Sequence, residues 1–312
     1  MSESSRDHLA FASLIGNTPC LHLLNSSAHY GCRIYGKIET RNPTGSHKDR
    51  ESLDVIRDAL SHGYHAVGCA STGNAAISLA ALSSMIGLTC HIYVSSGISK
   101  EKLNLIRSFH PILHRVDGSY EQAVHESNVE MREDNIYVAN PGQCRAKIEG
   151  DKKIGLEIAN KISPDVLVCP ANNGTHIIGV WEGIKEKNLR PVTIAATAKR
   201  TTIADSIGGF HRFEADRWKG FLRNSATQVI NVNDSQIQNA MNLLLRDGII
   251  TEPAGATSLA ALDHLDIQKN YTICCTITGS GLKFPRMLQR LLNTSQMSEA
   301  KKTKFHKCNY KT

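Results

Sequence analysis

The alternation of short apolar runs with helix-length amphipathic segments constrains the fold of this chain more than any other feature of its sequence. Each apolar run has the length of a buried strand, and each amphipathic segment has the length of a helix that packs on a sheet. Because consecutive parallel strands need a crossover helix between them, this alternation predicts an α/β fold built on parallel sheets. The predicted strands are 34–38, 66–69, 89–94, 166–169, 192–196 and 271–276, and two of the predicted helices are 74–85 and 234–246.

The composition is typical of a globular protein. The 312 residues are 41% hydrophobic and 21% charged, which allows a large core and two lobes. No apolar run approaches the roughly 18 to 20 residues that cross a bilayer, so we expect no membrane partner. The first residues contain no basic stretch that leads into an apolar one, so we expect no secretory signal. Nine cysteines without metal-site spacing favour free thiols in the cytoplasm and no metal ion.

More than half of the net charge of +7 lies at the end of the chain. From Glu299 onward five lysines stand against one glutamate, which gives +4 and leaves +3 for the rest of the chain. We predict that 297–312 is a polar, basic and disordered tail. A nucleic-acid surface needs aromatic side chains interleaved with basic ones, and aromatic residues make up only 5% of this sequence. We therefore expect no nucleic-acid partner.

A lysine in an unusual setting follows the first predicted strand. Residues 42–50 read N-P-T-G-S-H-K-D-R, with the lysine at position 48. An amine condenses with an aldehyde only if it can be neutral and is held in place, and burial helps because desolvation lowers the pKa of a lysine. Taken alone, the segment fits a solvated surface lysine as well, so the role of Lys48 depends on the rest of the chain.

Two polar loops lie where a predicted strand gives way to a helix. Residues 71–74, S-T-G-N, follow the strand at 66–69, and residues 170–176, P-A-N-N-G-T-H, follow the strand at 166–169. Free backbone N–H groups at the start of a helix bind anions, and glycine permits close approach. Both loops are therefore candidate anion sites, and an ordinary helix cap is the alternative for 71–74.

Several segments, in the same order along the chain, together resemble enzymes that use pyridoxal 5′-phosphate (PLP). The Lys48 segment and the 70–74 segment resemble the tryptophan-synthase-β superfamily, also called fold type II. Three later segments resemble the threonine synthases of that superfamily: 147–152 reads K-I-E-G-D-K against R-I-E-G-Q-K, 252–258 reads E-P-A-G-A-T-S against E-P-A-S-A-A-S, and 278–283 reads T-G-S-G-L-K against T-G-H-G-L-K. With I-G-N-T-P at 15–19, the resemblance covers about residues 14–290.

The resemblance implies a two-lobed α/β fold in which each lobe is a largely parallel sheet flanked by helices. The large, cofactor-binding lobe would comprise 1–48 and 137–296, and the small lobe 49–136, with PLP in the cleft between them. Many members are dimers, so we expect a homodimer, although the sequence identifies no interface.

The resemblance also implies roles for individual residues. Lys48 would be the catalytic residue, which forms the Schiff base with PLP and shuttles protons. Asn74 would bind the ring oxygen of PLP, and Thr278 would face the pyridine nitrogen, where a neutral hydroxyl favours elimination and replacement over transamination. The PLP phosphate would be bound by Asn172, Asn173, Gly174, Thr175 and His176, and the anionic groups of the substrate by Ser71, Thr72, Gly73 and Lys147.

The chain departs from the threonine synthase pattern at several positions near the cofactor. His47 replaces a phenylalanine, and Ser280 replaces the histidine of T-G-H-G. Lys147 replaces an arginine, so a single ammonium group stands where the guanidinium would offer several hydrogen-bond donors in a plane. In 172–176, which aligns with G-N-A-G-N, Asn173 matches but two glycines are replaced. His47 is either a general base or, more simply, a packed ring.

These features predict a PLP-dependent enzyme of amino-acid metabolism that is most like threonine synthase. Such an enzyme converts O-phospho-L-homoserine and water into L-threonine and phosphate, so its substrate is a phosphorylated amino acid. The departures favour an alternative, a diverged relative that performs β-elimination or β-replacement on O-phosphoserine, serine or threonine, as a deaminase or as the synthase of an unusual amino acid. A PLP-binding protein without catalysis is a third interpretation, and the retained Lys48, Asn74 and Thr278 argue against it.

Overall fold

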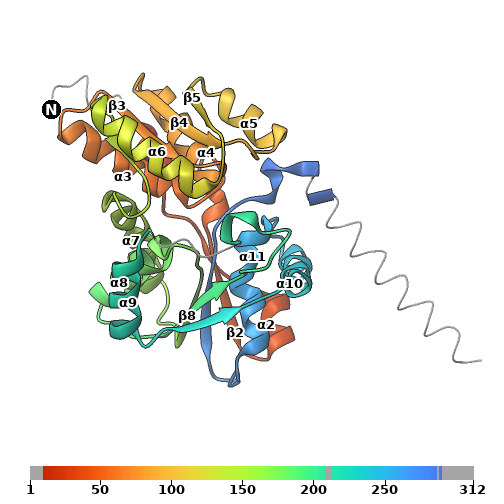
Figure 1. Ribbon diagram of the computed structural model, residues 1–312. Helices are drawn as coiled ribbons and strands as arrows, with labels where there is room; N and C mark the ends of the chain where they lie inside the picture. The colour runs from red at the N-terminus through yellow and green to blue at the C-terminus, as the bar shows by residue number, and fades with distance from the viewer. Residues whose placement is uncertain (1–9, 209–212, 287, 290–312) are drawn as a thin grey trace, which may run out of the picture.

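Two sheets, one in each lobe, organise the chain in a computed structural model that describes residues 10–208, 213–286 and 288–289 (Figure 1). The predicted tail, 297–312, lies outside the described residues. The lobe with the smaller sheet lies above the lobe with the larger one, and helix α3, Lys48–Ser61, leads from one to the other. No helix in the described part of the chain is long and apolar enough to cross a membrane.

The large sheet has six strands in the order β1-β2-β10-β7-β8-β9. All neighbouring strands are parallel except β1 and β2, which are antiparallel. The strands are β1 Cys20–His22, β2 Arg33–Ile38, β7 Val166–Pro170, β8 Val192–Thr197, β9 Gln228–Asn231 and β10 Thr272–Ile277. The helices around them are α2 Leu24–Tyr30, α7 Ala146–Ala159, α8 Thr175–Glu186, α9 Ala215–Ser225, α10 Asp234–Arg246 and α11 Pro253–Ala260.

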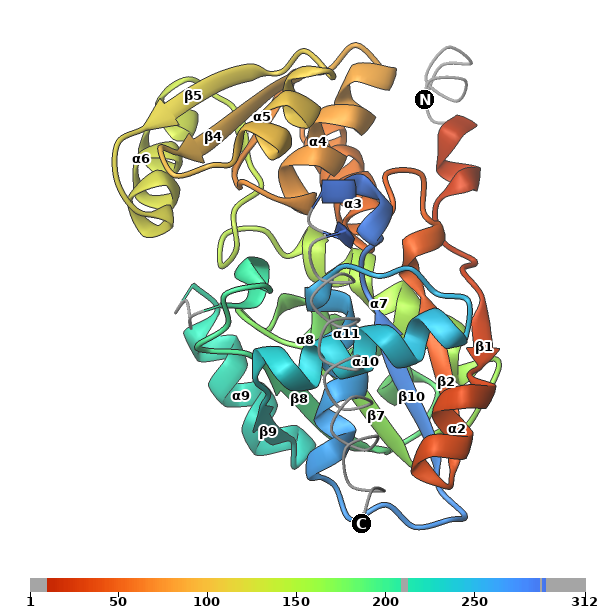
Figure 2. The same cartoon turned by 90° about the vertical axis from the view of Figure 1, so that its right-hand side faces the viewer.

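Helices cover both faces of this sheet: α7, α8 and α9 lie on one face and α2, α10 and α11 on the other (Figures 1 and 2). Strand β7 shows the consequence, because Val166 and Val168 pack on the α10 and α11 side while Leu167 and Cys169 pack on the α7 and α8 side. A strand that is buried on both faces is apolar at every position. This is why the central strands read as continuous apolar runs in the sequence.

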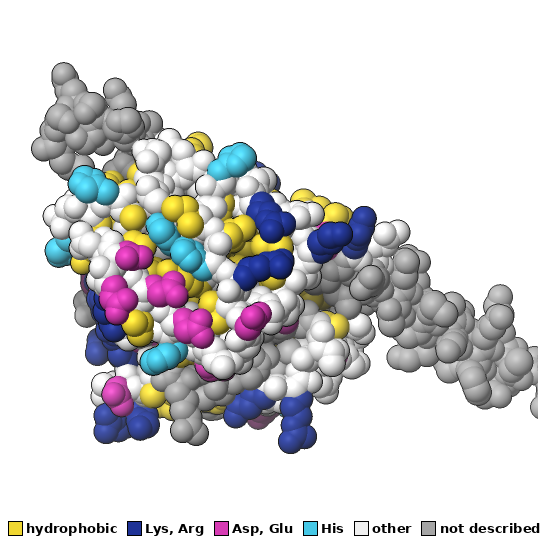
Figure 3. All heavy atoms as spheres, turned by 45° about the horizontal axis from the view of Figure 1, so that its top comes forward, with side chains coloured by type: hydrophobic (Ala, Val, Ile, Leu, Met, Phe, Trp, Pro, Cys, Tyr) yellow, Lys and Arg dark blue, Asp and Glu magenta, His cyan; other side chains and the backbone are white. Residues whose placement is uncertain are grey.

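The small sheet has four parallel strands in the order β5-β4-β3-β6. They are β3 Ala66–Ala70, β4 Thr89–Ser95, β5 Ile112–Val116 and β6 Tyr137–Val138, with helices α4 Asn74–Met85, α5 Lys100–Arg107 and α6 Tyr120–Glu133. Because β6 pairs with β3, this sheet extends two residues past the predicted end of the small lobe at 136. The exposed side of α6 carries four glutamates, and Figure 3 shows acidic side chains gathered on this face.

The predicted strands and helices are all present in the structure. Each of the six strands is found with no end displaced by more than one residue, and α4 and α10 have the predicted bounds. The sequence did not predict β1, β5, β6 and β9. These are edge strands or very short ones, and their partly exposed side chains weaken the apolar pattern. Five short 3₁₀ helices complete the described structure: η1 Ala10–Leu14, η2 Glu39–Arg41, η3 Asp205–Ile207, η4 Ala261–His264 and η5 Gly281–Lys283.

Glycines bring α7 unusually close to its neighbours. A Cβ atom added to Gly155 would lie 2.0 Å from the carbonyl oxygen of Val180 in α8, and one added to Gly183 would lie 2.0 Å from the carbonyl oxygen of Lys152. On its other side, a Cβ atom on Gly150 would lie 2.6 Å from a backbone oxygen of α3. Helices α3, α7 and α8 therefore pack backbone against backbone, so that polar side chains on all three helices can meet.

A buried ion network fixes the start of α3 to the large lobe. Arg50 is 2% exposed, and its guanidinium donates to Glu39 in η2 and to Glu157 in α7, with nitrogen–oxygen distances of 2.7 Å to each carboxylate. Lys37 of β2 pairs with the same Glu157. Burial works against charge on Glu39, yet the adjacent Arg50 holds the pKa of this carboxyl below its usual value. The network thus anchors the first turn of α3, where Lys48 lies.

Candidate active site

A cavity of about 290 Å³ lies where β3, β7 and β10 end. The carboxyl ends of parallel strands are the usual place for ligands in open α/β sheets. Every residue to which the sequence assigned a role lines this cavity: Lys48, Ser71, Thr72, Gly73, Asn74, Lys147, Asn172, Asn173, Gly174, Thr175, His176 and Thr278. The structure therefore brings together five chain segments that are far apart in the sequence.

Lys48 is the first residue of α3 and points to a carboxylate of the same helix. Its Nζ donates a hydrogen bond to Oε1 of Glu51, one turn further along. The chain enters this helix through a turn at Gly45, which has φ 78°, and the side chain of Asp49 accepts the backbone N–H of Thr44 at 2.7 Å. Glycine is favoured at such a positive φ, which explains its place in the segment. The turn and its hydrogen bond fix the position of Lys48.

Glu51 is shared by three basic groups. Besides Lys48, it lies 3.5 Å from Nζ of Lys147 and 3.6 Å from Nε2 of His47. Burial disfavours its charge, but Lys48 and then Lys147 hold the pKa of Glu51 well below its usual value. Burial also opposes the charge on Lys147, and Glu51 outweighs it and raises the pKa of Lys147. A charged carboxylate therefore lies between the amino groups of two lysines that line the cavity.

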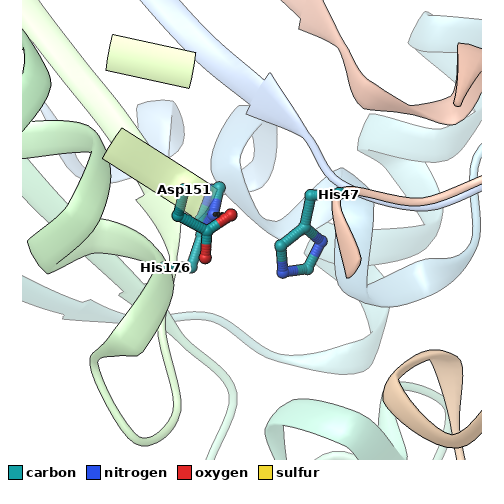
Figure 4. Close-up of side chains that lie close together, drawn as sticks. All are labelled: His47, Asp151 and His176. Atoms are coloured by element: carbon teal, nitrogen blue, oxygen red, sulfur yellow. Dashed lines mark ion pairs between the residues drawn. The ribbon is translucent and has the colours of Figure 1, made fainter. Parts of the chain in front are cut away.

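His47, Asp151 and His176 form a second buried group next to Glu51 (Figure 4). Nδ1 of His176 lies 3.3 Å from Asp151, and its Nε2 lies 3.0 Å from the hydroxyl of Thr276. The rings of His47 and His176 are 4.6 Å apart between centroids. Although burial works against it, Asp151 raises the pKa of His176 to about 10, while burial and then Glu51 raise the pKa of Asp151 to about 7. Because the pKa of the imidazole is the higher of the two, we place the proton of the pair on His176, which is then a cation beside Asp151.

His47 lies in a different electrostatic setting. Burial, followed by the charges of Lys48 and His176, lowers its pKa well below the usual value, so this ring is neutral. Its Nδ1 lies 3.2 Å from the backbone oxygen of Thr278. The two histidines therefore differ in charge although their rings touch.

Asn74, the first residue of α4, is held by hydrogen bonds at both ends of its amide. Its Nδ2 donates to Glu252 at 2.7 Å, and its Oδ1 accepts from Lys283. Burial raises the pKa of Glu252 and lowers that of Lys283, and each group partly offsets the shift of the other. Ser280 does not line the cavity, because its hydroxyl accepts the N–H of Leu282 and caps η5. The replacement of histidine at this position thus leaves a capping residue.

The 172–176 loop places the start of α8 at the cavity. Gly174 has φ 96°, and a Cβ atom there would lie 2.6 Å from the ring of Trp218, so this position requires glycine. The first N–H groups of a helix have no partner within it and can bind an anion. The side-chain oxygens of Asn172 and Asn173 are buried and have no hydrogen-bond partner among the described residues. Unpaired polar atoms of this kind indicate a ligand that completes their hydrogen bonds.

The groups around the cavity fit PLP. The start of α8 can bind a phosphate, Lys48 is placed as an amine for an aldehyde, and Asn74 and Thr278 offer an amide and a hydroxyl to a ring. The volume is close to the lower end of the roughly 300 to 1,000 Å³ of small-molecule sites. The cavity therefore suits a ligand of this size and this set of groups.

Three acidic residues near the cavity were not predicted from the sequence: Glu51, Asp151 and Glu252. The first two follow Lys48 by three residues and Lys147 by four, which places each on the same helix face as a lysine that was identified. Helix periodicity could therefore have found Glu51 and Asp151. Nothing local indicates that Glu252 lies next to Asn74, because that contact depends on the approach of the two lobes.

Comparisons with known proteins support the same cofactor. A family model described as pyridoxal-phosphate dependent enzyme matches residues 11–279. The threonine synthase of Bacillus sp. (strain ULM1) is 32% identical over 296 residues, covering 86% of this chain and 84% of that enzyme. The threonine synthase of Methanocaldococcus jannaschii is 30% identical over 308 residues, covering 86% and 76%. Among solved structures, maize serine racemase aligns with a TM-score of 0.79 at 21% identity over 95% of this chain and 98% of that one, which confirms the predicted fold class.

Proposed function

This chain belongs to the family of pyridoxal-phosphate dependent enzymes, and we propose that it catalyses elimination and replacement on an amino acid as threonine synthases do. The substrate would be O-phospho-L-homoserine, a phosphorylated amino acid, and the products L-threonine and phosphate. The observation that carries the proposal is the convergence on one cavity of all twelve residues to which the sequence assigned roles.

The residues of this chain would have the following roles in binding and proton transfer. Bound PLP would supply an electron sink for the substrate carbon next to the amino group. The N–H groups at the start of α8 would bind the cofactor phosphate, Asn74 would orient the ring, and Thr278 would offer the pyridine nitrogen a neutral hydroxyl. Lys48 would hold the cofactor and move protons at its Nζ. Ser71, Thr72 and Gly73 would bind the substrate carboxylate, and Lys147 would bind its phosphate.

The surroundings of Lys147 favour a second candidate function. Its ammonium lies 3.5 Å from Glu51 and donates to the backbone oxygen of Ala139 at 3.2 Å, so much of its bonding capacity is already used. A shorter substrate without a distal phosphate needs no free cation at this position. This favours β-elimination or β-replacement on serine or threonine, and O-phosphoserine remains a candidate for the same chemistry.

Product analysis separates the two functions. The PLP-loaded protein would be given O-phospho-L-homoserine, and phosphate and threonine would be measured together. Their joint release, abolished by Lys48→Ala, is expected for a threonine synthase. Release of ammonia and a keto acid from serine, threonine or O-phosphoserine would instead identify a β-eliminase. A cofactor spectrum that no amino acid changes would refute both and identify a binding protein without catalysis.

We also propose a cytoplasmic location and a homodimer. The eight cysteines within the described residues are free, and Cys169, Cys274 and Cys275 are fully buried, which suits a reducing compartment. The homodimer follows from the resemblance to dimeric enzymes, and sedimentation velocity of the purified protein would measure the oligomeric state.

A further inference from the structure

Three departures from the threonine synthase pattern meet in one place. His47 replaces a phenylalanine, Asp151 stands at the glutamine of R-I-E-G-Q-K, and His176 stands at the last asparagine of G-N-A-G-N. These positions are more than twenty residues apart along the chain, yet one nitrogen or oxygen atom from each lies within 4.8 Å of the others (Figure 4). Three replacements that create one buried polar group are better explained together than as separate changes.

The hydrogen bonds of His47 define the tautomer of its neutral ring. Nδ1 lies 3.2 Å from the carbonyl oxygen of Thr278, and a carbonyl can only accept, so Nδ1 carries the proton. Nε2 then holds a lone pair, and it lies 3.6 Å from Oε1 of Glu51, the same oxygen that accepts the hydrogen bond of Lys48. A single carboxylate oxygen thus accepts a hydrogen bond from Lys48 and lies 3.6 Å, just beyond hydrogen-bond distance, from a nitrogen that can take up a proton.

The other two members hold His47 in this state. The ring of His176 lies 4.6 Å from that of His47 between centroids and is itself held by Asp151 and Thr276. Burial and the charge of Lys48 keep the ring of His47 neutral at rest, and the cation of His176 adds to this effect, so a proton that His47 accepts is held only transiently. Asp151 is fully buried, and the glycine contacts between α7 and α8 determine how close it lies to His176.

We infer that His47 is a second proton acceptor of this active site, which takes a proton from Lys48 through Glu51, and that His176 and Asp151 are its positioning residues. The inference rests on the proposed function. In this step Lys48 loses one proton and becomes a neutral amine, His47 gains one at Nε2 and becomes a cation, and Glu51 ends with the charge it had at the start. A neutral Lys48 is the form that attacks an aldehyde or removes a proton from a substrate.

The surrounding charges favour proton transfer over metal binding at this cluster. The charged groups near His47 are Lys48 and Glu51 from α3, Asp151 from α7 and His176 from α8, and Lys147 from α7 lies against Glu51. Two carboxylates are already balanced by two ammonium groups, and His176 adds a further positive charge. A divalent cation would have to displace the proton of His176, and it would still add net positive charge to a buried site whose two carboxylates already face two ammonium groups.

The test uses PLP-loaded protein and four variants. His47→Phe restores the residue of the related enzymes, and His47→Gln keeps a donor for the carbonyl of Thr278 but cannot take up a proton. His176→Asn removes the neighbouring cation. His62→Phe is the control, because His62 is an exposed histidine at the other end of α3. Cofactor absorbance and circular dichroism establish that each variant is folded and loaded before it is assayed.

The inference predicts a change in the pH profile as well as in the rate. In the wild type, kcat/KM falls at low pH as His47 is protonated, below the usual histidine pKa of about 6.5. Both His47 variants should lower kcat/KM by about 100-fold, the lower end for a proton-transfer group, and should lose this acid limb. His176→Asn should move the acid limb to higher pH, since a charge that opposes protonation of His47 is gone. His62→Phe should leave rate and profile unchanged.

A second measurement does not depend on turnover. NMR of ¹⁵N-labelled histidines in the PLP-loaded protein, assigned with His47→Phe, should show His47 neutral with its proton on Nδ1. A proton on Nε2, or a transition metal present at one equivalent and lost in His176→Asn, would overturn the inference. So would unchanged rate and profile in both His47 variants of an active enzyme. If the wild type turns over no candidate amino acid, the proposed function fails, while the NMR result still decides the state of His47.

Discussion

The close packing of α7 on α8 makes Gly155→Ala a sharp test of how the site is held together. The added methyl carbon would lie 2.0 Å from the carbonyl oxygen of Val180 and 2.8 Å from the backbone nitrogen of Ile184. Ordinary contact begins near 3.4 Å, so the helices must separate by about 1.4 Å along this direction. Neither neighbouring atom belongs to a side chain that could rotate away.

The expected cost follows from two opposing effects. Overpacking in a well-packed interior costs about 1 to 3 kcal/mol, and the upper end applies because the clash is with backbone. Alanine in place of glycine gains about 0.5 to 1 kcal/mol in helix formation. We therefore expect the free energy of unfolding to fall by about 2 kcal/mol or more. The same separation would carry Asp151 away from His176, which lies 3.3 Å from it.

Urea unfolding followed by circular dichroism measures this loss, and Gly220→Ala is the matched control. Gly220 also lies within a helix, α9, but a Cβ atom there meets nothing within 4 Å. The control should gain about 0.5 to 1 kcal/mol, so the two identical substitutions should have opposite signs. An equal or higher midpoint for Gly155→Ala would refute the reasoning, because it would mean that α7 and α8 separate without cost.

Three further outcomes test other parts of the structure. Glu51→Gln in cofactor-free protein should cost about 3 to 5 kcal/mol at pH 7, because the ammonium groups of Lys48 and Lys147 lose their carboxylate. The pKa of Glu51 is lowered on folding, so urea titrations should show this difference constant above about pH 5 and shrinking below it, as the unfolded wild type takes up a proton at Glu51 that the folded protein does not bind. Lys48→Ala should remove the visible absorbance that a lysine-bound cofactor gives, measured after PLP addition and gel filtration. Asn233→Ala should cost about 1 kcal/mol in the same urea assay, since Asn233 and Gln236 cap α10 with reciprocal hydrogen bonds.

How much of the fold the sequence predicts depends on burial. Strands β7 and β10 are buried on both faces and were predicted within one residue. Strands β1 and β9 lie at the edges of the large sheet and carry exposed side chains, so their pattern does not differ from that of a loop. The alternation of strands and helices predicts the architecture because crossovers are right-handed and short. This alternation does not predict the edge strands of a sheet, because an edge strand needs no apolar pattern on its unpaired side.

The candidate site, like the fold, is predicted only in part from the sequence. Residues directly after a strand, such as Ser71 and Thr278, could be assigned to one edge of a sheet from the sequence, and they line one cavity in the structure. Their roles toward PLP and substrate remain predictions. The partners of those residues were not predicted: Glu252 reaches Asn74 from a segment 178 residues away. Such contacts depend on how the two lobes meet, which no local pattern records.

His47 shows why a departure from a family pattern is hard to interpret alone. Next to a lysine, an isolated histidine is more simply a packed ring, and the sequence offers no way to choose between the two interpretations. The choice depends on Asp151 and His176, which replace uncharged residues on α7 and α8. Their positions relative to His47 follow from backbone contacts at glycines, and these contacts place a charged histidine against a neutral one. A single replacement would leave a buried carboxylate or cation without a partner, which costs several kcal/mol. The physical constraint therefore couples Asp151 to His176, and His176 adds to burial and Lys48 in keeping His47 neutral.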